Sequence, residues 1–231
     1  MKIERISSGI PGLDKLVEGG FKKNSVNLIA GEAGAGKTIF AIQFLVEGCK
    51  RGEAGIYITF EEKREKLYED MFTMGIDLMH FEKKGLFKFL EYTPEQVKKL
   101  LVEGGGMVDA LVEKIKAKRI VIDSISSFSL LYEDELTKKE AALSLFDLIS
   151  NWNCSAVLTS QARSSENQVI MDAALEFEVD SIILMYHTKK GGERIRAIEI
   201  LKMRGTKIPS KTYTLGIGNK GIYVTNETIK L

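Results

Sequence analysis

The chain has 231 residues, which is enough for one large α/β domain with a substantial hydrophobic core. Its formal net charge is +1, from 33 Lys and Arg against 32 Asp and Glu, so the overall charge gives no reason to expect a nucleic acid or an anionic membrane as a partner. The two cysteines argue against a disulfide scaffold, and the charged N-terminus and short apolar runs argue against a signal peptide or a membrane span, so we expect a soluble, cytoplasmic protein.

A phosphate-binding loop is predicted near the start of the chain. Residues 7–23 carry turn signals around a short helical middle, residues 25–30 are typical of a buried strand, and residues 39–46 of an apolar helix. Between this strand and this helix, residues 31–38 match the pattern G-x-x-x-x-G-K-[ST] in full. The residues expected to contact a nucleotide are Gly31, Glu32, Ala33, Gly34, Ala35, Gly36, Lys37, Thr38 and Ile39.

Each part of this loop has a physical role toward ATP and Mg²⁺. The small residues let the backbone come close to a polyphosphate and point N–H groups at it. Lys37 supplies a positive charge for the β- and γ-phosphates, the Thr38 hydroxyl is placed to hold Mg²⁺, and the helix start directs its positive dipole end at the same anion. The alternative is a glycine-rich turn that contains a lysine by chance.

A pair of acids follows the next predicted strand, residues 54–60, and precedes a charged amphipathic helix over 63–74. Ligands of open α/β sheets bind at the carboxyl ends of strands, and ATP hydrolysis needs a group that orients or deprotonates water. Because successive strand side chains point opposite ways, we expect only one acid to face the phosphate, and we assign Glu61 as the base and Glu62 as structural. The alternative is a solvated helix start, where acids are common.

A metal-binding aspartate is predicted further along the chain. A strand over 86–91 and helical residues 94–118, interrupted at 104–106, lead to an apolar strand over 119–123 that ends in Asp123. A rigid strand that delivers a carboxylate beside a phosphate-binding loop is what Mg²⁺ coordination needs, although a helix or turn cap is the alternative.

The next strand could sense the γ-phosphate. A helix is predicted over 136–152 and a buried strand over 155–159, which Ser160 and Gln161 follow directly. These two polar side chains could hydrogen-bond to the phosphate, or they could simply be polar residues at a strand end.

The last quarter of the chain predicts an antiparallel extension. Its predicted strands are 181–186, 194–201, 212–217 and 221–224, with turns at 189–192 and 218–220. Strands that alternate with helices over the first three quarters imply a mostly parallel, twisted sheet flanked by helices. We therefore expect a single α/β domain over residues 1–231 with the phosphate-binding loop at its centre.

Four of these motifs resemble the KaiC branch of the RecA-like ATPases: residues 31–38, 59–62, 120–124 and 201–206. The lead-in at 6–14 is similar to that branch too, and the resemblance spans nearly the whole chain. It is greatest to the single-domain KaiC-like proteins of archaea. The resemblance implies a RecA-like P-loop NTPase fold and a homo-oligomeric, hexameric ring with ATP between subunits.

The same resemblance implies roles for individual residues. The family's paired catalytic glutamates map onto Glu61 and Glu62, and its lysine and arginine that reach across the subunit interface map onto Lys202 and Arg204. Further nucleotide contacts would fall on Thr206, Gly218 and Asn219. Residues i and i+2 of a strand point the same way, so the two cations can converge on one target. The alternative is a pair of exposed edge charges that discourage aggregation.

One stretch departs from the clock proteins of this branch. Their second domain carries hydroxyl residues that accept phosphate a few residues before the strand that matches 181–186. Here Glu176 and Phe177 occupy that stretch, so we expect no autokinase activity.

Three functions stay open at this point. The first is Mg-dependent ATP hydrolysis in a homo-oligomeric ring that regulates or signals to a partner the sequence does not name. The second is a recombinase-related ATPase that binds single-stranded DNA, but the loop with Glu133, Asp134 and Glu135 should repel phosphates, and the loop over 162–172 has one basic residue, Arg163. The third is a nucleotide-dependent scaffold without turnover.

Overall fold

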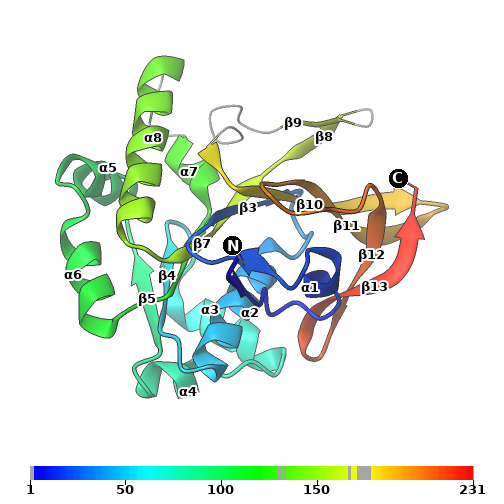
Figure 1. Ribbon diagram of the computed structural model, residues 1–231, viewed down its shortest axis with the longest axis horizontal. Helices are drawn as coiled ribbons and strands as arrows, with labels where there is room; N and C mark the ends of the chain where they lie inside the picture. Colours follow the sequence, from blue (N-terminus) through cyan, green and yellow to red (C-terminus); the bar gives the residue numbers. More distant parts are fainter. Residues whose placement is uncertain (1–2, 130–131, 133, 166–167, 171–177, 231) are drawn as a thin grey trace.

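The computed structural model describes residues 3–129, 132, 134–165, 168–170 and 178–230. In this part of the chain, nine strands form one sheet in the order β13-β12-β11-β10-β3-β7-β6-β4-β5 (Figure 1). Six of them are parallel: β3 (Val26–Gly31), β4 (Gly55–Thr59), β5 (Phe87–Glu91), β6 (Arg119–Asp123), β7 (Ser155–Gln161) and β10 (Ser181–Lys190). The other three continue the sheet antiparallel: β11 (Glu193–Met203), β12 (Thr212–Gly218) and β13 (Gly221–Ile229).

The central parallel strands are covered on both faces, which is why they are mostly apolar. All six residues of β3 and all five of β4 are buried. One hydrophobic core lies between the sheet and the helices α1 (Leu13–Leu16), α2 (Lys37–Lys50), α3 (Arg64–Thr73) and α4 (Leu78–Lys83). The other lies against α6 (Gly106–Ile115), α7 (Ile125–Ser129) and α8 (Glu135–Asn151), with α5 (Pro94–Val102) beside them.

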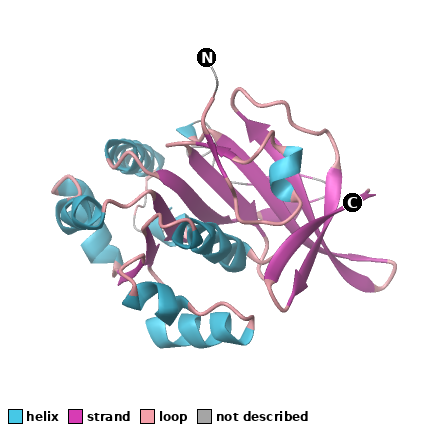
Figure 2. Cartoon of the chain, turned by 60° about the horizontal axis from the view of Figure 1, so that its bottom comes forward, coloured by secondary structure: helices cyan, strands magenta, loops and turns pink. Residues whose placement is uncertain are grey.

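The expected fold class is confirmed: a mostly parallel sheet flanked by helices, with an antiparallel extension at the C-terminus. Most of the helices lie beside the parallel strands, and the antiparallel strands extend away from them (Figure 2). Strands β10 and β11 are longer than the predicted 181–186 and 194–201. The residues beside the turn that joins them are polar and exposed, so the apolar pattern did not include them. In the described part of the chain, no helix is both long enough and apolar enough to cross a membrane.

Local signals account for the helix boundaries. The Thr93 hydroxyl accepts from the backbone N–H of Gln96, whose side chain bonds back to the N–H of Thr93, and this capping box starts α5. The interruption expected at 104–106 separates α5 from α6, because all three glycines there have positive φ. Helix α8 starts where the Asp134 carboxylate accepts from the N–H of Thr137, at 2.8 Å.

Several short elements were not predicted. They are α4, α7, the hairpin of β8 (Arg163–Ser165) and β9 (Gln168–Ile170), and the pairing of β1 (Arg5–Ile6) with β2 (Phe21–Lys22). The two helices span six residues or fewer and the four strands three or fewer, which is too short for a helical or a strand period to show in the sequence. The expectations for Glu133, Glu176 and Phe177 lie outside the described residues, as do parts of both loops considered for DNA binding.

Candidate functional site

The loop between β3 and α2 adopts a backbone that only glycine accepts easily. Gly34 has φ +76° and Gly36, the residue before α2, has φ +102°. The Lys37 Nζ donates to the carbonyls of Gly31 and Glu32, each at 2.9 Å, which closes the loop around its lysine. Burial lowers the pKa of Lys37, and the charges of Asp123 and Glu32 oppose this shift. The structure thus keeps a partly desolvated cation where the sequence predicts the phosphates.

Two side chains, one from β10 and one from β11, contact the same loop from outside. The Arg196 Nε donates to the Gly34 carbonyl at 3.0 Å, and the His187 Nδ1 lies 3.4 Å from the Ala33 carbonyl. His187 and Arg196 are paired across β10 and β11. Sequence reasoning missed both residues, because they lie more than 150 positions from the loop and belong to no motif.

We expect Arg196→Ala to weaken ATP binding about three- to tenfold, because the loop would lose a charge-assisted hydrogen bond that orders it before the nucleotide arrives. Arg194, which lies two residues earlier on β11 and is exposed, provides the matched control. Titration of each alanine variant with ATP checks this. Equal affinities in the two variants would contradict a role for Arg196.

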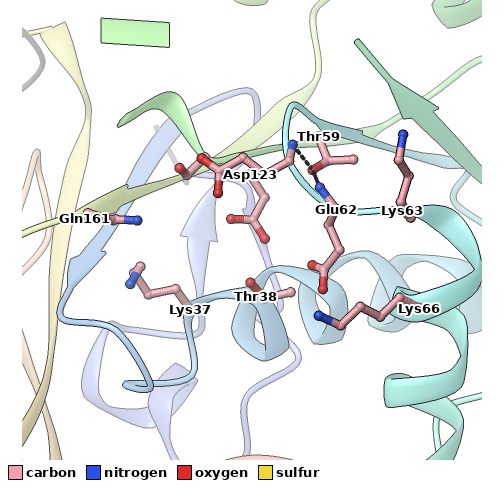
Figure 3. Close-up of a pocket in the computed structure, with 10 residues that line it drawn as sticks. Lys37, Thr38, Thr59, Glu62, Lys63, Lys66, Asp123 and Gln161 are labelled. Carbon is pink, nitrogen blue, oxygen red and sulfur yellow. Dashed lines mark hydrogen bonds between the residues drawn. The ribbon is translucent and has the colours of Figure 1, made fainter. Parts of the chain in front are cut away.

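A cavity of about 500 Å³ opens beside the loop, at the carboxyl ends of β4, β6 and β7 (Figure 3). Five side chains point toward it from the start of α2, the turn after β4, and the ends of β6 and β7: Lys37, Thr38, Glu62, Asp123 and Gln161 (Figure 3). The complete lining is Lys37, Thr38, Thr59, Glu61, Glu62, Lys63, Lys66, Asp123, Ser124 and Gln161. Six of the residues that the sequence assigned to phosphate, metal and water therefore line one cavity: Lys37, Thr38, Glu61, Glu62, Asp123 and Gln161.

Asp123 is held by hydroxyl groups on both neighbouring strands. Its Oδ2 accepts from the Tyr57 hydroxyl of β4 at 2.7 Å, and its Oδ1 accepts from the Thr159 hydroxyl of β7. Burial, followed by the charge of Asp123, raises the pKa of Tyr57 well above its usual range, so this phenol stays a donor. Tyr57 and Thr159 were also missed, since the pairing of the parallel strands decides which side chains flank Asp123.

The donor set fits Mg²⁺. Among the described residues no three His, Cys, Asp or Glu side chains gather as a metal site. Mg²⁺ rarely needs such a cage, because it binds one or two protein oxygens and takes the rest from phosphates and water. The Thr38 hydroxyl and the Asp123 carboxylate face each other across the cavity (Figure 3). The buried Ser124 Oγ, which also lines the cavity, has no hydrogen-bond partner among the described residues.

The two glutamates both line the cavity, and the sequence predicts that only one of them faces the phosphate. The strand ends at Thr59, and both acids lie in the turn before α3, where the strand alternation no longer applies. The Glu61 carboxylate is exposed and accepts from the Ser127 hydroxyl. Glu62 is half-buried and points toward Thr38 (Figure 3). Burial, then the charges of Asp123 and Asp70, raises its pKa.

Ser160 and Gln161 are placed differently from each other at the end of β7. Gln161 lines the cavity, and its N–H donates to the Ser126 hydroxyl at 2.7 Å. Ser160 is buried, and its hydroxyl lies 3.3 Å from that of Ser126, outside the cavity lining. Gln161 alone of this pair is therefore positioned to touch a ligand in the cavity.

The segment that carries Lys202, Arg204 and Thr206 lies at the opposite end of the strands from the cavity, where the parallel strands begin. Met185 of β10 pairs with Gly31 at the loop, whereas Ser181 pairs with both Asn27 and Met203. Four residues of strand therefore separate these ends, roughly 13 Å at 3.3 Å per residue. The structure does not bring these three residues to the cavity.

Gly218 and Asn219 lie in the β12–β13 turn, beside α2 and outside the cavity lining. Ile217 and Ile222 flank this turn, and each has an atom 3.5 Å from where a Cβ of Gly36 would lie. The Asn219 carbonyl oxygen lies 2.9 Å from where a Cβ of Gly75, between α3 and α4, would lie. The turn is thus near the loop that the sequence predicts to bind phosphate.

A RecA-like sheet with a phosphate-binding loop at the end of its central strand defines the class of P-loop NTPases. The model of the family "ATPase: KaiC" matches residues 6–229, and the chain belongs to this family. The circadian clock protein KaiC3 of Synechocystis is 33% identical over 94% of this chain, which spans 45% of that relative. The UPF0273 protein PH0284 of Pyrococcus horikoshii is 31% identical over 95% of this chain and 93% of its own length. The crystal structure of the KaiC-like protein PH0186 from Pyrococcus horikoshii superposes with a TM-score of 0.86 at 33% identity, covering 97% of this chain and all of that one.

Proposed function

We propose that the protein is a Mg-dependent ATPase that works as a homo-oligomeric ring with regulatory output, in which each ATP lies between two subunits. One observation carries the ring: the cavity groups and the Lys202–Arg204 pair lie at opposite ends of one sheet, so no subunit joins them by itself. A second copy of the chain could bring its Lys202 and Arg204 to the open cavity. We also propose that the ring has six subunits, as the resemblance to KaiC-like proteins implies.

The residues of the cavity divide the work of hydrolysis. Bound Mg²⁺ would neutralise charge on the phosphates, and Thr38 with Asp123 would hold it. Lys37 and the loop N–H groups bind and orient the phosphates. Glu62 would accept a proton from the attacking water, and Gln161 would donate to the γ-phosphate. Lys202 and Arg204 of the neighbouring subunit would stabilise the charge that develops in the transition state.

The surroundings favour Glu62 over Glu61 as the base. The Glu62 carboxyl points into the cavity and has a raised pKa, which brings a base closer to the working pH. The Glu61 carboxylate is engaged by Ser127 on α7. We therefore assign water activation to Glu62 and the positioning of α7 to Glu61.

Mixing two inactive variants tests the ring. We expect Lys37→Ala subunits and Arg204→Ala subunits each to be inactive alone and to regain activity when co-assembled. Some interfaces of a mixed ring would combine an intact loop with an intact Arg204. ATP hydrolysis is measured across mixing ratios, with the size of the assembly measured in the same samples.

Mixed rings that form but stay inactive at every ratio would overturn the action of Arg204 across the interface. Addition of single-stranded DNA to the parent protein separates the alternatives. Stimulated turnover would favour a recombinase-related function, and tight ATP binding without turnover would favour a scaffold.

We also expect no stable autophosphorylation, because Glu176 and Phe177 carry no hydroxyl to accept phosphate. Incubation with Mg·ATP followed by intact-mass measurement checks this. A stoichiometric gain of one phosphate would contradict the expectation.

A further inference from the structure

Arg5, near the N-terminus, reaches the segment that carries Arg204, although the two lie 199 positions apart in sequence. Its Nη2 donates to the Thr206 hydroxyl at 2.9 Å and to Glu18 at 3.1 Å. Its Nη1 donates to the carbonyls of Val17 and Gly20, at 3.2 and 2.9 Å. Only 11% of the Arg5 side chain is exposed, so this guanidinium is built into the fold.

The geometry of these contacts fixes where the guanidinium points. The turn over 17–20 has positive φ at Glu18, Gly19 and Gly20, and the carbonyls of its first and last residues accept from Nη1. Because the guanidinium is planar and rigid, anchoring Nη1 also sets the position of Nη2. Nη2 is thereby directed at Thr206.

The segment that receives this contact is a tight turn. The Thr206 N–H donates to the Met203 carbonyl at 3.2 Å, and Gly205 has φ +64°. On its other side, the Arg204 N–H donates to the Asp180 carbonyl at 2.9 Å, and the Asp180 carboxylate accepts from the N–H of Val26 at 3.0 Å. The turn is therefore held at Asp180 by the sheet and at Thr206 by Arg5.

We propose that Arg5 is a positioning residue for the neighbouring subunit's ATP, acting through the turn that carries Arg204 and Thr206. The inference rests on the proposed action of Arg204 across the interface. The Thr206 hydroxyl oxygen accepts from Arg5. The hydroxyl proton of Thr206 is then available to donate to an anion in the neighbouring subunit. Arg5 lies at the same end of the sheet as Met203, away from its own phosphate-binding loop. It therefore serves the site of the next subunit and not its own.

The test assigns Arg5 to a complementation group. We expect Arg5→Met subunits to bind ATP within a few-fold of the parental affinity and to turn it over roughly 10- to 100-fold more slowly, the scale of a small misplacement of a reacting group. Mixed with Lys37→Ala subunits they should regain activity. Some interfaces then combine the intact phosphate-binding loop of an Arg5→Met subunit with the intact Arg204 turn of a Lys37→Ala subunit. Mixed with Arg204→Ala subunits they should stay slow, because every turn in such a ring is defective.

The reverse pattern would overturn the proposal. If Arg5 served its own subunit, the mixture with Arg204→Ala would recover and the mixture with Lys37→Ala would not. Loss of ATP binding in Arg5→Met as complete as in Lys37→Ala would overturn it as well. Failure of the Lys37→Ala and Arg204→Ala pair to complement is a separate result, which removes the trans action and this inference with it.

Two further variants guard against misfolding and against a general effect of the N-terminal strand. Arg5→Lys keeps the charge but not the planar fork, so we expect the same mixing pattern with a smaller loss. If Arg5→Met does not assemble, the mixing experiment is done with Arg5→Lys instead. Lys23→Met removes a nearby cation whose side chain is 46% exposed and pairs with Glu4 at 2.9 Å, and it should leave turnover unchanged. A loss in Lys23→Met equal to that in Arg5→Met would contradict the proposal.

Discussion

Lys37→Ala should abolish ATP binding while the protein stays folded. The Lys37 Nζ donates to two loop carbonyls, and its side chain lines the cavity, where we expect it to exchange these acceptors for phosphate oxygens. Burial lowers the pKa of this lysine, so the folded state holds the charged form at a disadvantage. This cost opposes the two hydrogen bonds that the variant loses, so we expect only a small change in the thermal midpoint. ATP titration and circular dichroism on the same sample check both parts.

Lys66 supplies the control for Lys37. It lies on α3, lines the same cavity and is exposed, but it contacts neither loop carbonyl. Lys66→Ala removes the same charge from the same cavity, and we expect it to change ATP affinity by no more than a few-fold. If Lys37→Ala bound ATP as tightly as the parent protein, the cavity would not be the nucleotide site.

Glu62→Gln should bind Mg·ATP normally and hydrolyse it at least ~100-fold more slowly, the scale of a lost general base. Glu61→Gln is the matched control, and we expect it to retain most of the turnover. Steady-state hydrolysis and ATP titration of both variants check this. The opposite result, with loss in Glu61→Gln and parental turnover in Glu62→Gln, would assign the water to Glu61 as the alternation of strand residues suggested.

The pH dependence gives a second measurement on Glu62. A base must be deprotonated, so parental turnover should fall as the pH drops through the raised pKa of this carboxyl. A raised pKa in the folded state also means that the parent loses stability as the pH rises through that value. Glu62→Gln should therefore be more heat-stable than the parent at neutral pH, and this advantage should vanish in acid. Thermal melts at both pH values check the sign.

The parts of the candidate site that could be predicted are those whose chemistry is local. Lys37 and Asp123 each stand at a fixed position relative to one strand, so their place in the sheet follows from their immediate neighbours. The partners that hold these groups could not be predicted. Arg196 and Tyr57 reach the site through strand pairings that join distant parts of the chain, and strand order is a property of the whole fold.

The glutamate pair shows a different limit. The period-2 rule applies only while the strand lasts, and β4 ends two residues before Glu61. The side-chain directions of Glu61 and Glu62 are set instead by the turn into α3, where both backbone N–H groups donate to the Thr59 hydroxyl. No pattern in the sequence marks that turn.

The separation of Arg204 from the cavity by the height of the sheet has a consequence for how activity responds to dilution. If each ATP site is completed only by a second chain, the active assembly forms by mass action. Its concentration then falls more steeply than the total protein concentration on dilution. We expect specific activity, per milligram, to decline on dilution and to recover on reconcentration. The amount of protein present would then act as a switch on hydrolysis, without any further ligand.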